Sequence, residues 1–240
     1  MNKKIITIIM AIFLNFSIFL LGNDDFTDYK DIDDFIMTKD ELADDSISIV
    51  DGQFTIFYSS NRIKAKGPVR KSKKEGEWTI YYDNSEGGGI MSKGLYIADK
   101  KNGQWVTFYM NGKTMMKAVY KNNELNGQLL LFTDEGHPFA EVMYKNNMKD
   151  GVLRSYHPSG IPKEISMFKN DKRDGMQNFY YPNGKKRAIG PYTDGIKNGL
   201  WRFYYETGRV KYEGNYVKDK KSGKWKTFDA AGKVIETETY

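Results

Sequence analysis

The sequence contains no cysteine, which excludes disulfide bonds, thiolate metal sites and cysteine nucleophiles. Histidine is almost as scarce, because His137 and His157 are the only two in 240 residues, and each precedes a proline. No carboxylate accompanies them at a metal-ligand spacing, so they are interpreted as turn residues rather than as a metal pair. A glycine-rich phosphate loop, a nucleophile elbow and a paired-carboxylate motif are also missing. We therefore predict a chain that is not an enzyme and has no catalytic residue, metal site or cofactor.

Proline is rare too, with 6 residues, whereas glycine reaches 23. Aromatic residues make up 15% of the chain and include 17 tyrosines and 14 phenylalanines. Aromatic side chains favour β-strands, and glycine favours the tight turns between them. The composition therefore predicts an all-β fold.

The one long hydrophobic run lies near the N-terminus, where Lys3 and Lys4 precede Ile5–Leu21. This layout is typical of a secretory signal and predicts residues 1–22 as a signal peptide or membrane anchor. The run is at the short limit for a membrane-spanning helix, so both alternatives stay open. We expect the chain to be exported and periplasmic, outer-surface or secreted, or else anchored in the inner membrane through residues 5–21.

Residues 23–50 are predicted to form an acidic linker. The stretch from Asp24 to Asp45 contains ten acidic residues against two lysines, whereas Ser46–Tyr240 has a net charge of +12. Like charges at this density favour a solvated segment over a packed element. A basic body thus follows an acidic leader.

The remainder, residues 51–240, is an array of similar units that each begin with a glycine. These unit glycines recur every 24 residues, except for one interval of 27 residues between Gly76 and Gly103. The longer interval contains the segment 84–89, which lengthens one hairpin tip. The eight unit glycines are Gly52, Gly76, Gly103, Gly127, Gly151, Gly175, Gly199 and Gly223.

Each unit shows the same order of residue types, counted here from its unit glycine. The plus-two residue is large and apolar in every unit except that of Gln177, and the plus-five residue is always aromatic. A second glycine at plus nine marks a hairpin tip in most units. The dipeptides Asn111-Gly112 and Asn183-Gly184 predict type I′ turns at these tips. A second strand, closed by an aromatic residue, and a polar connector complete the unit.

A single hairpin buries too little surface to be stable, but repeated hairpins can stack their aromatic side chains on those of their neighbours. We therefore predict an extended, twisted antiparallel meander of about eight β-hairpin repeats, preceded by an N-terminal hydrophobic helix and the acidic linker. The plus-two and plus-five positions are unevenly spaced for strict alternation. A bulge or strong local twist near the unit glycine would reconcile them.

The unit GLWRFYYETGRVKYEGNYVKDKKSG, which starts at Gly199, resembles the MORN repeat in its bacterial variant form. The resemblance extends from Gly52 to about Gly232. It implies an extended β-meander that is used for protein or lipid contacts and for self-association, with no catalytic residues to carry over. The variant form is also found in antitoxins of toxin–antitoxin pairs. The first unit departs from the pattern because it lacks the hairpin-tip glycine, so it is expected to act as a cap.

Two sets of side chains are candidates for packing and for binding. The first is a predicted structural ladder, for which the alternative is a stacking platform for a glycan or a peptide. It consists of Trp78, Trp105, Phe108, Phe132, Tyr156, Tyr180, Trp201, Tyr204, Trp225 and Phe228. The second is the plus-six slot, predicted to be an interaction face because its residues vary at the centre of the array. It consists of Tyr58, Tyr82, Tyr109, His157, Tyr181 and Tyr205.

Lysines are frequent in the connectors and are predicted to line one edge of the array. They either contact anionic lipid or surface polymer, or are solvated turn residues that prevent edge pairing. They are Lys71, Lys73, Lys74, Lys100, Lys101, Lys218, Lys220 and Lys221. Nucleic acid is not expected as a partner of an exported chain.

The sequence thus predicts a non-catalytic scaffold that binds a protein or a cell-surface polymer. Two alternatives stay open. One is an antitoxin-like immunity protein that neutralises a partner toxin, and the other is a module that binds anionic lipid or glycan.

Overall fold

The computed structural model describes residues 51–83 and 89–240. The predicted signal peptide or anchor, its helix and the acidic linker of residues 23–50 lie outside the described residues. Within those residues every regular element is a β-strand, which confirms the predicted all-β class. They contain no helix with the length and hydrophobicity that a membrane crossing requires.

The described residues form 18 strands in one sheet. The strands are β1 (Gly52–Phe57), β2 (Ile63–Arg70), β3 (Lys73–Lys74), β4 (Gly76–Tyr81), β5 (Ile90–Ile97), β6 (Lys100–Phe108), β7 (Thr114–Lys121), β8 (Glu124–Phe132), β9 (Pro138–Lys145), β10 (Met148–Tyr156), β11 (Pro162–Lys169), β12 (Lys172–Tyr180), β13 (Lys186–Thr193), β14 (Ile196–Lys197), β15 (Gly199–Tyr204), β16 (Val210–Val217), β17 (Lys220–Phe228) and β18 (Val234–Thr239).

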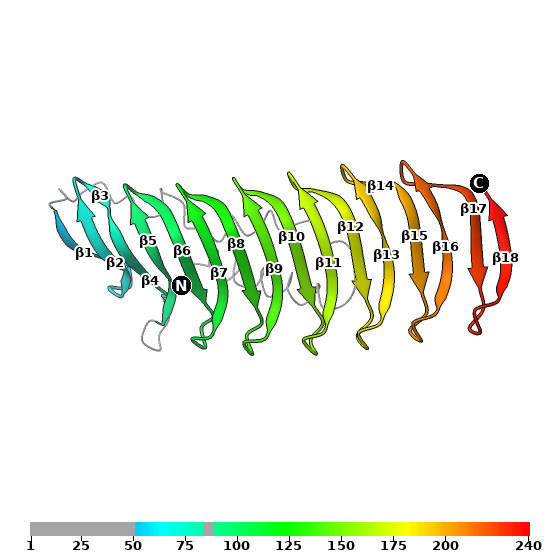
Figure 1. Cartoon of the computed structure of the whole chain (residues 1–240). Helices are drawn as coiled ribbons and strands as arrows, with labels where there is room; N and C mark the ends of the chain where they lie inside the picture. The colour runs from blue at the N-terminus through cyan, green and yellow to red at the C-terminus, as the bar shows by residue number, and fades with distance from the viewer. Residues whose placement is uncertain (1–50, 84–88) are drawn as a thin grey trace. The chain divides into compact units, whose positions relative to one another are not determined.

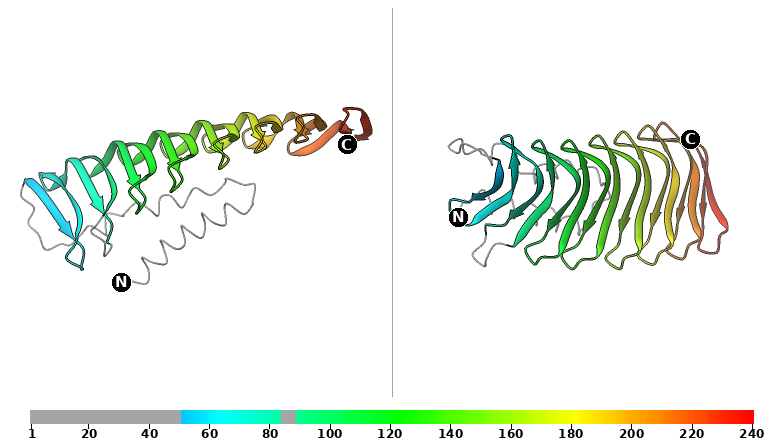
Figure 2. Two further views of the ribbon diagram at one scale, coloured as in Figure 1. Left: turned by 90° about the horizontal axis from the view of Figure 1, so that it is seen from below. Right: turned by 60° about the vertical axis from the view of Figure 1, so that its left-hand side comes forward.

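The strands follow one another across the sheet in sequence order, and each long strand pairs antiparallel with the next long strand (Figure 1). Strands β3 and β14 are short lead-ins that pair with β2 and β13 just before β4 and β15 begin. The remaining strands form eight hairpins, which agrees with the eight predicted units. The sheet is a single layer of curved strands (Figure 2).

The turns at the hairpin tips differ from the prediction. Type I′ turns occur at the connectors, where both turn residues have positive φ, as at Asn122 (54°) and Asn123 (72°). At the described tips only one residue does, which is Asn61 in the first hairpin (61°) and a glycine in the others, with φ of 79° at Gly112. The N–H of Gly112 donates to the carbonyl of Tyr109 at 2.9 Å, so the tip is a three-residue loop closed by a glycine. The predicted type I′ turn at Asn111-Gly112 and Asn183-Gly184 is therefore wrong.

Pairing irregularities occur at two places in the units. Between hairpins the register of β9 and β10 shifts between Lys149 and Leu153, around the unit glycine, as predicted. Within all eight hairpins it shifts between the plus-four and plus-five residues. These shifts do not bring plus two and plus five onto one face, because the pleat places residues an odd number apart on opposite faces.

The core lies on the face that carries the plus-two tryptophans, called here the tryptophan face. The four indoles are only 1–3% exposed, although no second layer of described residues covers them. A glycine of the preceding hairpin faces each ring. A Cβ atom at Gly190, for example, would lie 2.2 Å from the indole of Trp201. The other three pairs are Gly67–Trp78, Gly94–Trp105 and Gly214–Trp225.

Each indole also closes a hydrogen bond to the preceding hairpin. The Nε1–H group of Trp201 donates to the carbonyl of Pro191 at 3.1 Å, and the other three indoles bond equivalent carbonyls at 2.9–3.1 Å. Because a buried N–H without a partner is costly, these bonds fix the ring orientation as well as adding stability. Neighbouring tyrosines meet the rings edge-on, as Tyr216 does with Trp225 at a centroid distance of 5.1 Å.

Candidate interaction surface

The predicted interaction face forms a row of contacts along the hairpin tips. Each of its six predicted side chains bonds the backbone carbonyl of the plus-five residue in the next hairpin. The tyrosine hydroxyls donate at 2.5–2.9 Å, in Tyr58–Tyr81, Tyr82–Phe108, Tyr109–Phe132, Tyr181–Tyr204 and Tyr205–Phe228. His157 contacts the carbonyl of Tyr180 through Nε2 at 3.0 Å. The polar ends of all six predicted residues therefore link neighbouring hairpins, and the rings are half-buried.

Two units break this row of tip contacts. Thr133 has a side chain too short to reach the next hairpin, and its Oγ1 instead accepts from the N–H of His137 at 3.2 Å. Asp229, in the last unit, accepts from Ala231 and Lys233 within its own tip. The link between the fourth and fifth hairpins thus lacks a plus-six contact, although its strands stay paired.

The predicted structural ladder is divided between the two faces. Its tryptophans are buried on the tryptophan face, whereas its plus-five rings are half-buried on the opposite face. Lysines of the preceding hairpin mark that opposite face, because the Nζ of Lys66 lies 5.5 Å from the ring centroid of Tyr81. We call it the lysine face. The plus-five residues of the ladder are Phe108, Phe132, Tyr156, Tyr180, Tyr204 and Phe228.

The connectors are linked by asparagine and aspartate side chains. The Oδ1 of Asn123 accepts from the N–H of Lys101 at 2.6 Å, and the N–H of Asn123 donates to the carbonyl of Lys101 at 3.0 Å. Asp99, Asn147, Asp171 and Asp219 repeat this reciprocal pair with Lys74, Leu125, Lys149 and Lys197. These residues combine tolerance of positive φ with a short acceptor, so the type I′ turn and the link require the same residue types.

Three of the predicted connector lysines lie over aromatic rings: Lys74 and Lys101 are half-buried there, and Lys221 stays exposed. The Nζ atoms of Lys74, Lys101 and Lys221 are 4.5–5.4 Å from the ring centroids of Trp78, Trp105 and Trp225. Lys197 repeats the arrangement over Trp201 at 5.0 Å. Such contacts stabilise a cation by its attraction to the face of the ring. Burial lowers the pKa of Lys101 to about 8, and the nearby Lys74 ammonium lowers it further in the same direction.

The other predicted connector lysines, Lys71, Lys73, Lys100, Lys218 and Lys220, are exposed. This outcome fits solvated turn residues, and it leaves their ammonium groups available to an anionic partner. Sequence spacing did not separate the two groups. The signal that could have done so is position, because the lysines that lie over indoles all stand two residues before a unit glycine.

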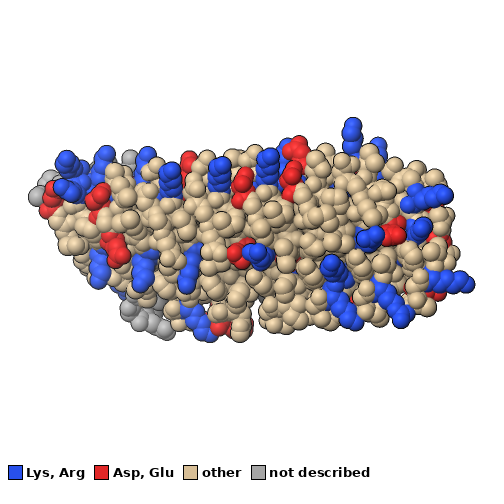
Figure 3. Space-filling view, in the orientation of Figure 1, with Lys and Arg blue, Asp and Glu red and all other residues tan. Residues whose placement is uncertain are grey.

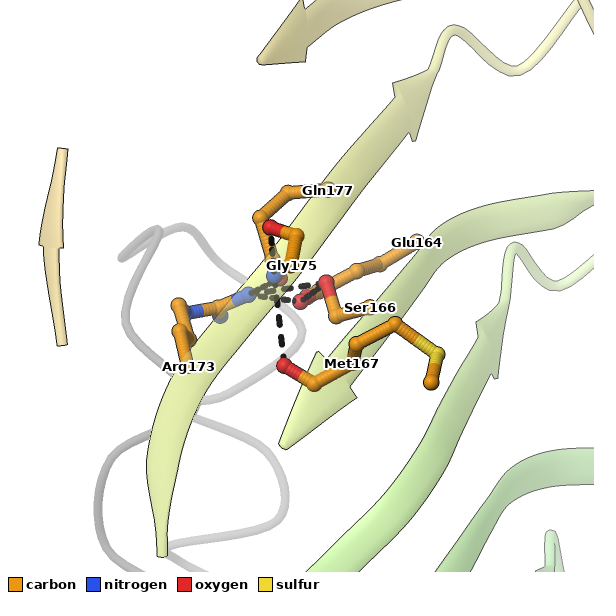
Figure 4. A network of polar contacts seen from close by, with 6 residues as sticks. All are labelled: Glu164, Ser166, Met167, Arg173, Gly175 and Gln177. Atoms are coloured by element: carbon orange, nitrogen blue, oxygen red, sulfur yellow. Dashed lines mark hydrogen bonds and ion pairs between the residues drawn. The ribbon is translucent and has the colours of Figure 1, made fainter. Parts of the chain in front are cut away.

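A polar cluster interrupts the tryptophan face at strands β11 and β12 (Figure 4). The Nη1 of Arg173 donates to the carboxylate of Glu164, to Ser166 Oγ at 2.8 Å and to Gln177 Oε1 at 3.0 Å. Glu164 is only 4% exposed, and Ser166 also donates to it. The guanidinium lies 5.2–5.9 Å from the ring centroids of Phe168, Phe179 and Tyr192. A buried ion pair thus forms here, with Glu164 and Gln177 in places that apolar or aromatic side chains fill in most other units.

The lysine face carries an apolar strip at its centre. Met167, Met176 and Leu200 are 40%, 46% and 42% exposed. With Met143, Val152 and Pro191 they form the methionine patch, in which Val152 lies opposite Met167 and Met176 opposite Pro191. The ion pairs Glu141–Arg154 (3.2 Å) and Arg202–Glu213 (2.8 Å) stand toward its two ends. Figure 3 shows such a distribution, with charged side chains in rows and a broad uncharged area between them.

The described residues show no cluster of three histidine, aspartate or glutamate side chains that could hold a metal ion. His137 is exposed at a tip and His157 belongs to the tip contacts, so the structure does not bring them together as a site. The accessible surface of the described residues includes exposed methionines, half-buried rings and regularly spaced lysines.

Comparison with known proteins agrees with this geometry. No curated protein was found to be similar to the chain. The family model described as the MORN repeat variant matches residues 101–122, 149–170, 173–194, 197–218 and 221–240. Each match begins two residues before a unit glycine and covers one hairpin. This family is generally non-catalytic. The chain belongs to the MORN repeat family, in its variant form.

Proposed function

We propose that this chain is a non-catalytic repeat scaffold of the bacterial cell envelope or secreted fraction, which binds a protein or surface polymer through its lysine face. MORN repeats commonly act as scaffolds that bind protein or membrane lipid. One observation carries the choice of face. The tryptophan face is filled by its own side chains along the array, whereas the lysine face leaves Met167, Met176 and Leu200 exposed.

An exposed apolar strip with a charged surround is typical of a protein-binding surface. Methionine suits this use, because its unbranched side chain adapts to different partner shapes. The plus-six residues are also proposed to contribute, through the exposed parts of their rings, since their polar ends are used in tip contacts. The proposed location is supported by the charged start and apolar run of residues 1–22.

The test of binding is crosslinking and capture of partners from the producing cells with the full chain as bait. The double variant Met167→Glu/Met176→Glu places charge in the methionine patch without touching the tryptophan face. Its matched control, Ile97→Glu/Met110→Glu, changes two residues that are 47% and 53% exposed away from the patch. Loss of the captured partner in the first variant alone supports the proposal. Equal capture by both variants contradicts it.

The test of location is cell fractionation followed by N-terminal sequencing of the mature chain. An envelope or secreted fraction is expected. An unprocessed cytoplasmic chain would overturn the location and would favour the antitoxin-like alternative, whose test is a toxic product of a neighbouring gene. Binding of anionic lipid or glycan is the second alternative, for which the exposed lysine rows provide the charge.

A further inference from the structure

Three lysines of the lysine face form a row across the first three hairpins. Lys66 lies on β2, Lys93 on β5 and Lys117 on β7, at the same place in successive units. Each Nζ lies over the plus-five ring of the next hairpin, at 5.5 Å from Tyr81, 5.8 Å from Phe108 and 5.8 Å from Phe132. The row was not among the lysines that the sequence singled out.

The spacing of this row follows from strand pairing. Successive lysines are separated by two strands, so their backbone positions lie roughly 9.6 Å apart, which is twice the usual distance between paired strands. The rings beneath them restrict the ammonium groups, which lowers the entropy that a ligand would have to remove. Among the described residues none of the three forms an ion pair.

The row has a defined end. In the next unit the equivalent place is taken by Glu141, which is paired with Arg154 at 3.2 Å. At the other end Lys64, whose Nζ lies 5.6 Å from the ring centroid of Tyr58, adds positive charge. A ligand with negative charges at a matching interval would thus contact three ordered cations, and the carboxylate of Glu141 would repel a further negative charge.

Among polypeptide conformations, polyproline II matches this interval. It has three residues per turn and a rise of about 3.1 Å, so every third side chain lies on one face at roughly 9.3 Å. A β-strand alternates its faces and places every third side chain on the wrong side. Nucleic acid has phosphates about 3.4 Å apart along each strand, much denser than the lysine row.

We propose that Lys66, Lys93 and Lys117 bind an extended acidic polypeptide segment of a partner protein, in polyproline II conformation with a carboxylate at every third residue. This inference rests on the proposed function, whose partner it narrows to a chemical class. Charge complementarity fixes the ligand's register along the array, and the half-buried rings between the lysines contact its intervening residues.

The experiment uses the full chain and two fluorescent peptides of the same composition. In one, four Asp-Pro-Pro triplets follow one another; in the other, the four aspartates are consecutive. Fluorescence anisotropy at physiological salt is expected to show at least about tenfold tighter binding of the triplet peptide. Equal binding of both peptides, or binding of neither, would overturn the proposal.

A pair of triple variants tests the site itself. Lys66→Gln/Lys93→Gln/Lys117→Gln is expected to weaken binding of the triplet peptide at least about tenfold. The control Lys121→Gln/Lys145→Gln/Lys169→Gln removes the same charge from exposed lysines at the same strand spacing, and should weaken it less than about threefold. Equal losses would mean general attraction to a basic protein and would overturn the site. Circular dichroism checks that both variants keep the β-sheet.

Two further measurements distinguish the acidic-segment site from a general polyanion site and from the proposed scaffold function. Inorganic polyphosphate that binds more tightly than the triplet peptide, and whose binding is weakened by the Lys66/Lys93/Lys117 variant but not by the control variant, would assign the row to polyanions and overturn the polypeptide ligand. If the peptides fail while capture of a partner still depends on Met167 and Met176, the scaffold function stands and only the acidic-segment site is lost.

Discussion

Gln177 donates from Nε2 to the carbonyl of Met167 at 3.2 Å, and so keeps the hydrogen bond that an indole makes at the same place in other units. The substitution is part of a larger exchange. The boundary between the third and fourth units contains Met116, Ala118, Leu125 and Leu129. The equivalent places between the fifth and sixth units contain Glu164, Ser166, Arg173 and Gln177. One chain thus holds an apolar and an ionic version of the same packing site.

The ionic version should be replaceable by the apolar one. The quadruple variant Glu164→Met/Ser166→Ala/Arg173→Leu/Gln177→Leu is expected to fold with a free energy of unfolding equal to or higher than that of the unmodified chain, since buried ion pairs rarely exceed well-packed apolar groups in stability. Urea denaturation followed by tryptophan fluorescence measures it.

Removing only the acidic partner of the Glu164–Arg173 ion pair should destabilise the fold. Glu164→Met alone leaves Arg173, 17% exposed in its side chain, without its carboxylate and should cost about 2 to 4 kcal/mol. A single variant as stable as the quadruple one would show that the Glu164–Arg173 pair contributes nothing at this boundary.

Glycine opposite tryptophan is expected to be a strict requirement. Gly190→Ala places a methyl group into the indole of Trp201 and should lower the free energy of unfolding by about 1 to 3 kcal/mol. In a Trp201→Leu background the same change should cost clearly less, because Ala118 already packs opposite Leu129. A double-mutant cycle measures the coupling, and additive effects would refute the size match.

The missing tip contact offers a stabilising change. Thr133→Tyr should reproduce the contact that Tyr109 and Tyr181 make, and should raise the free energy of unfolding by about 0.5 to 1.5 kcal/mol. Thr133→Phe is the matched control, with the ring but no hydroxyl donor. If the two variants are equally stable in urea, the hydroxyl bond is not the cause.

The buried Lys101 makes stability depend on pH. Its pKa of about 8 lies below the ordinary value of 10.5, so between these pH values the unfolded chain binds more protons than the folded one. Stability relative to Lys101→Leu should therefore be lowest below pH 8 and rise from pH 8 toward 10. The variant copies Leu125, which occupies the equivalent place in the next unit. A flat difference between the two chains over pH 7.5–9.5 would contradict the shift.

Tyrosines act in the opposite direction at higher pH. Burial raises the pKa of Tyr96 and Tyr109 to about 12 from the ordinary 10.0, so both stay neutral in the folded chain while they ionise in the unfolded one. Stability is thus fully present below pH 10 and is lost as the pH rises toward 12. Measurements of Lys101 should stay below pH 10 for this reason.

Most of the fold could be predicted from the repeat period. Recurrent glycines and aromatics predicted the hairpin unit, the number of units and the all-β class, because a period of this kind leaves few ways to bury one aromatic row. The turn assignment failed because Asn-Gly suits two backbone geometries. The connector pair Asn122-Asn123, which has no glycine, takes the type I′ turn because its second side chain also bonds Lys101.

The candidate surface was harder to predict. Tyr82 and Trp78 are both large aromatic residues of the same unit, so the sequence does not distinguish their roles. In the structure Tyr82 lies at the tip and Trp78 in the core, a difference that only the pairing between hairpins reveals. Likewise Lys101 and Lys100 are neighbours, but the pleat places one over a ring and leaves the other exposed. Contacts between units depend on register, which a pattern within one unit does not contain.

The match of glycine with indole also bears on how such an array can change during evolution. A unit with tryptophan at plus two is compatible only with a preceding unit that has a glycine opposite the indole in its second strand, as Gly94 lies opposite Trp105. Units are therefore not interchangeable, and a recombination that joined the hairpin of Val142 directly to that of Trp201 would set a branched side chain against an indole. Gain and loss of units should be confined to junctions where the plus-two side chain of one unit fits the residue opposite it in the preceding unit.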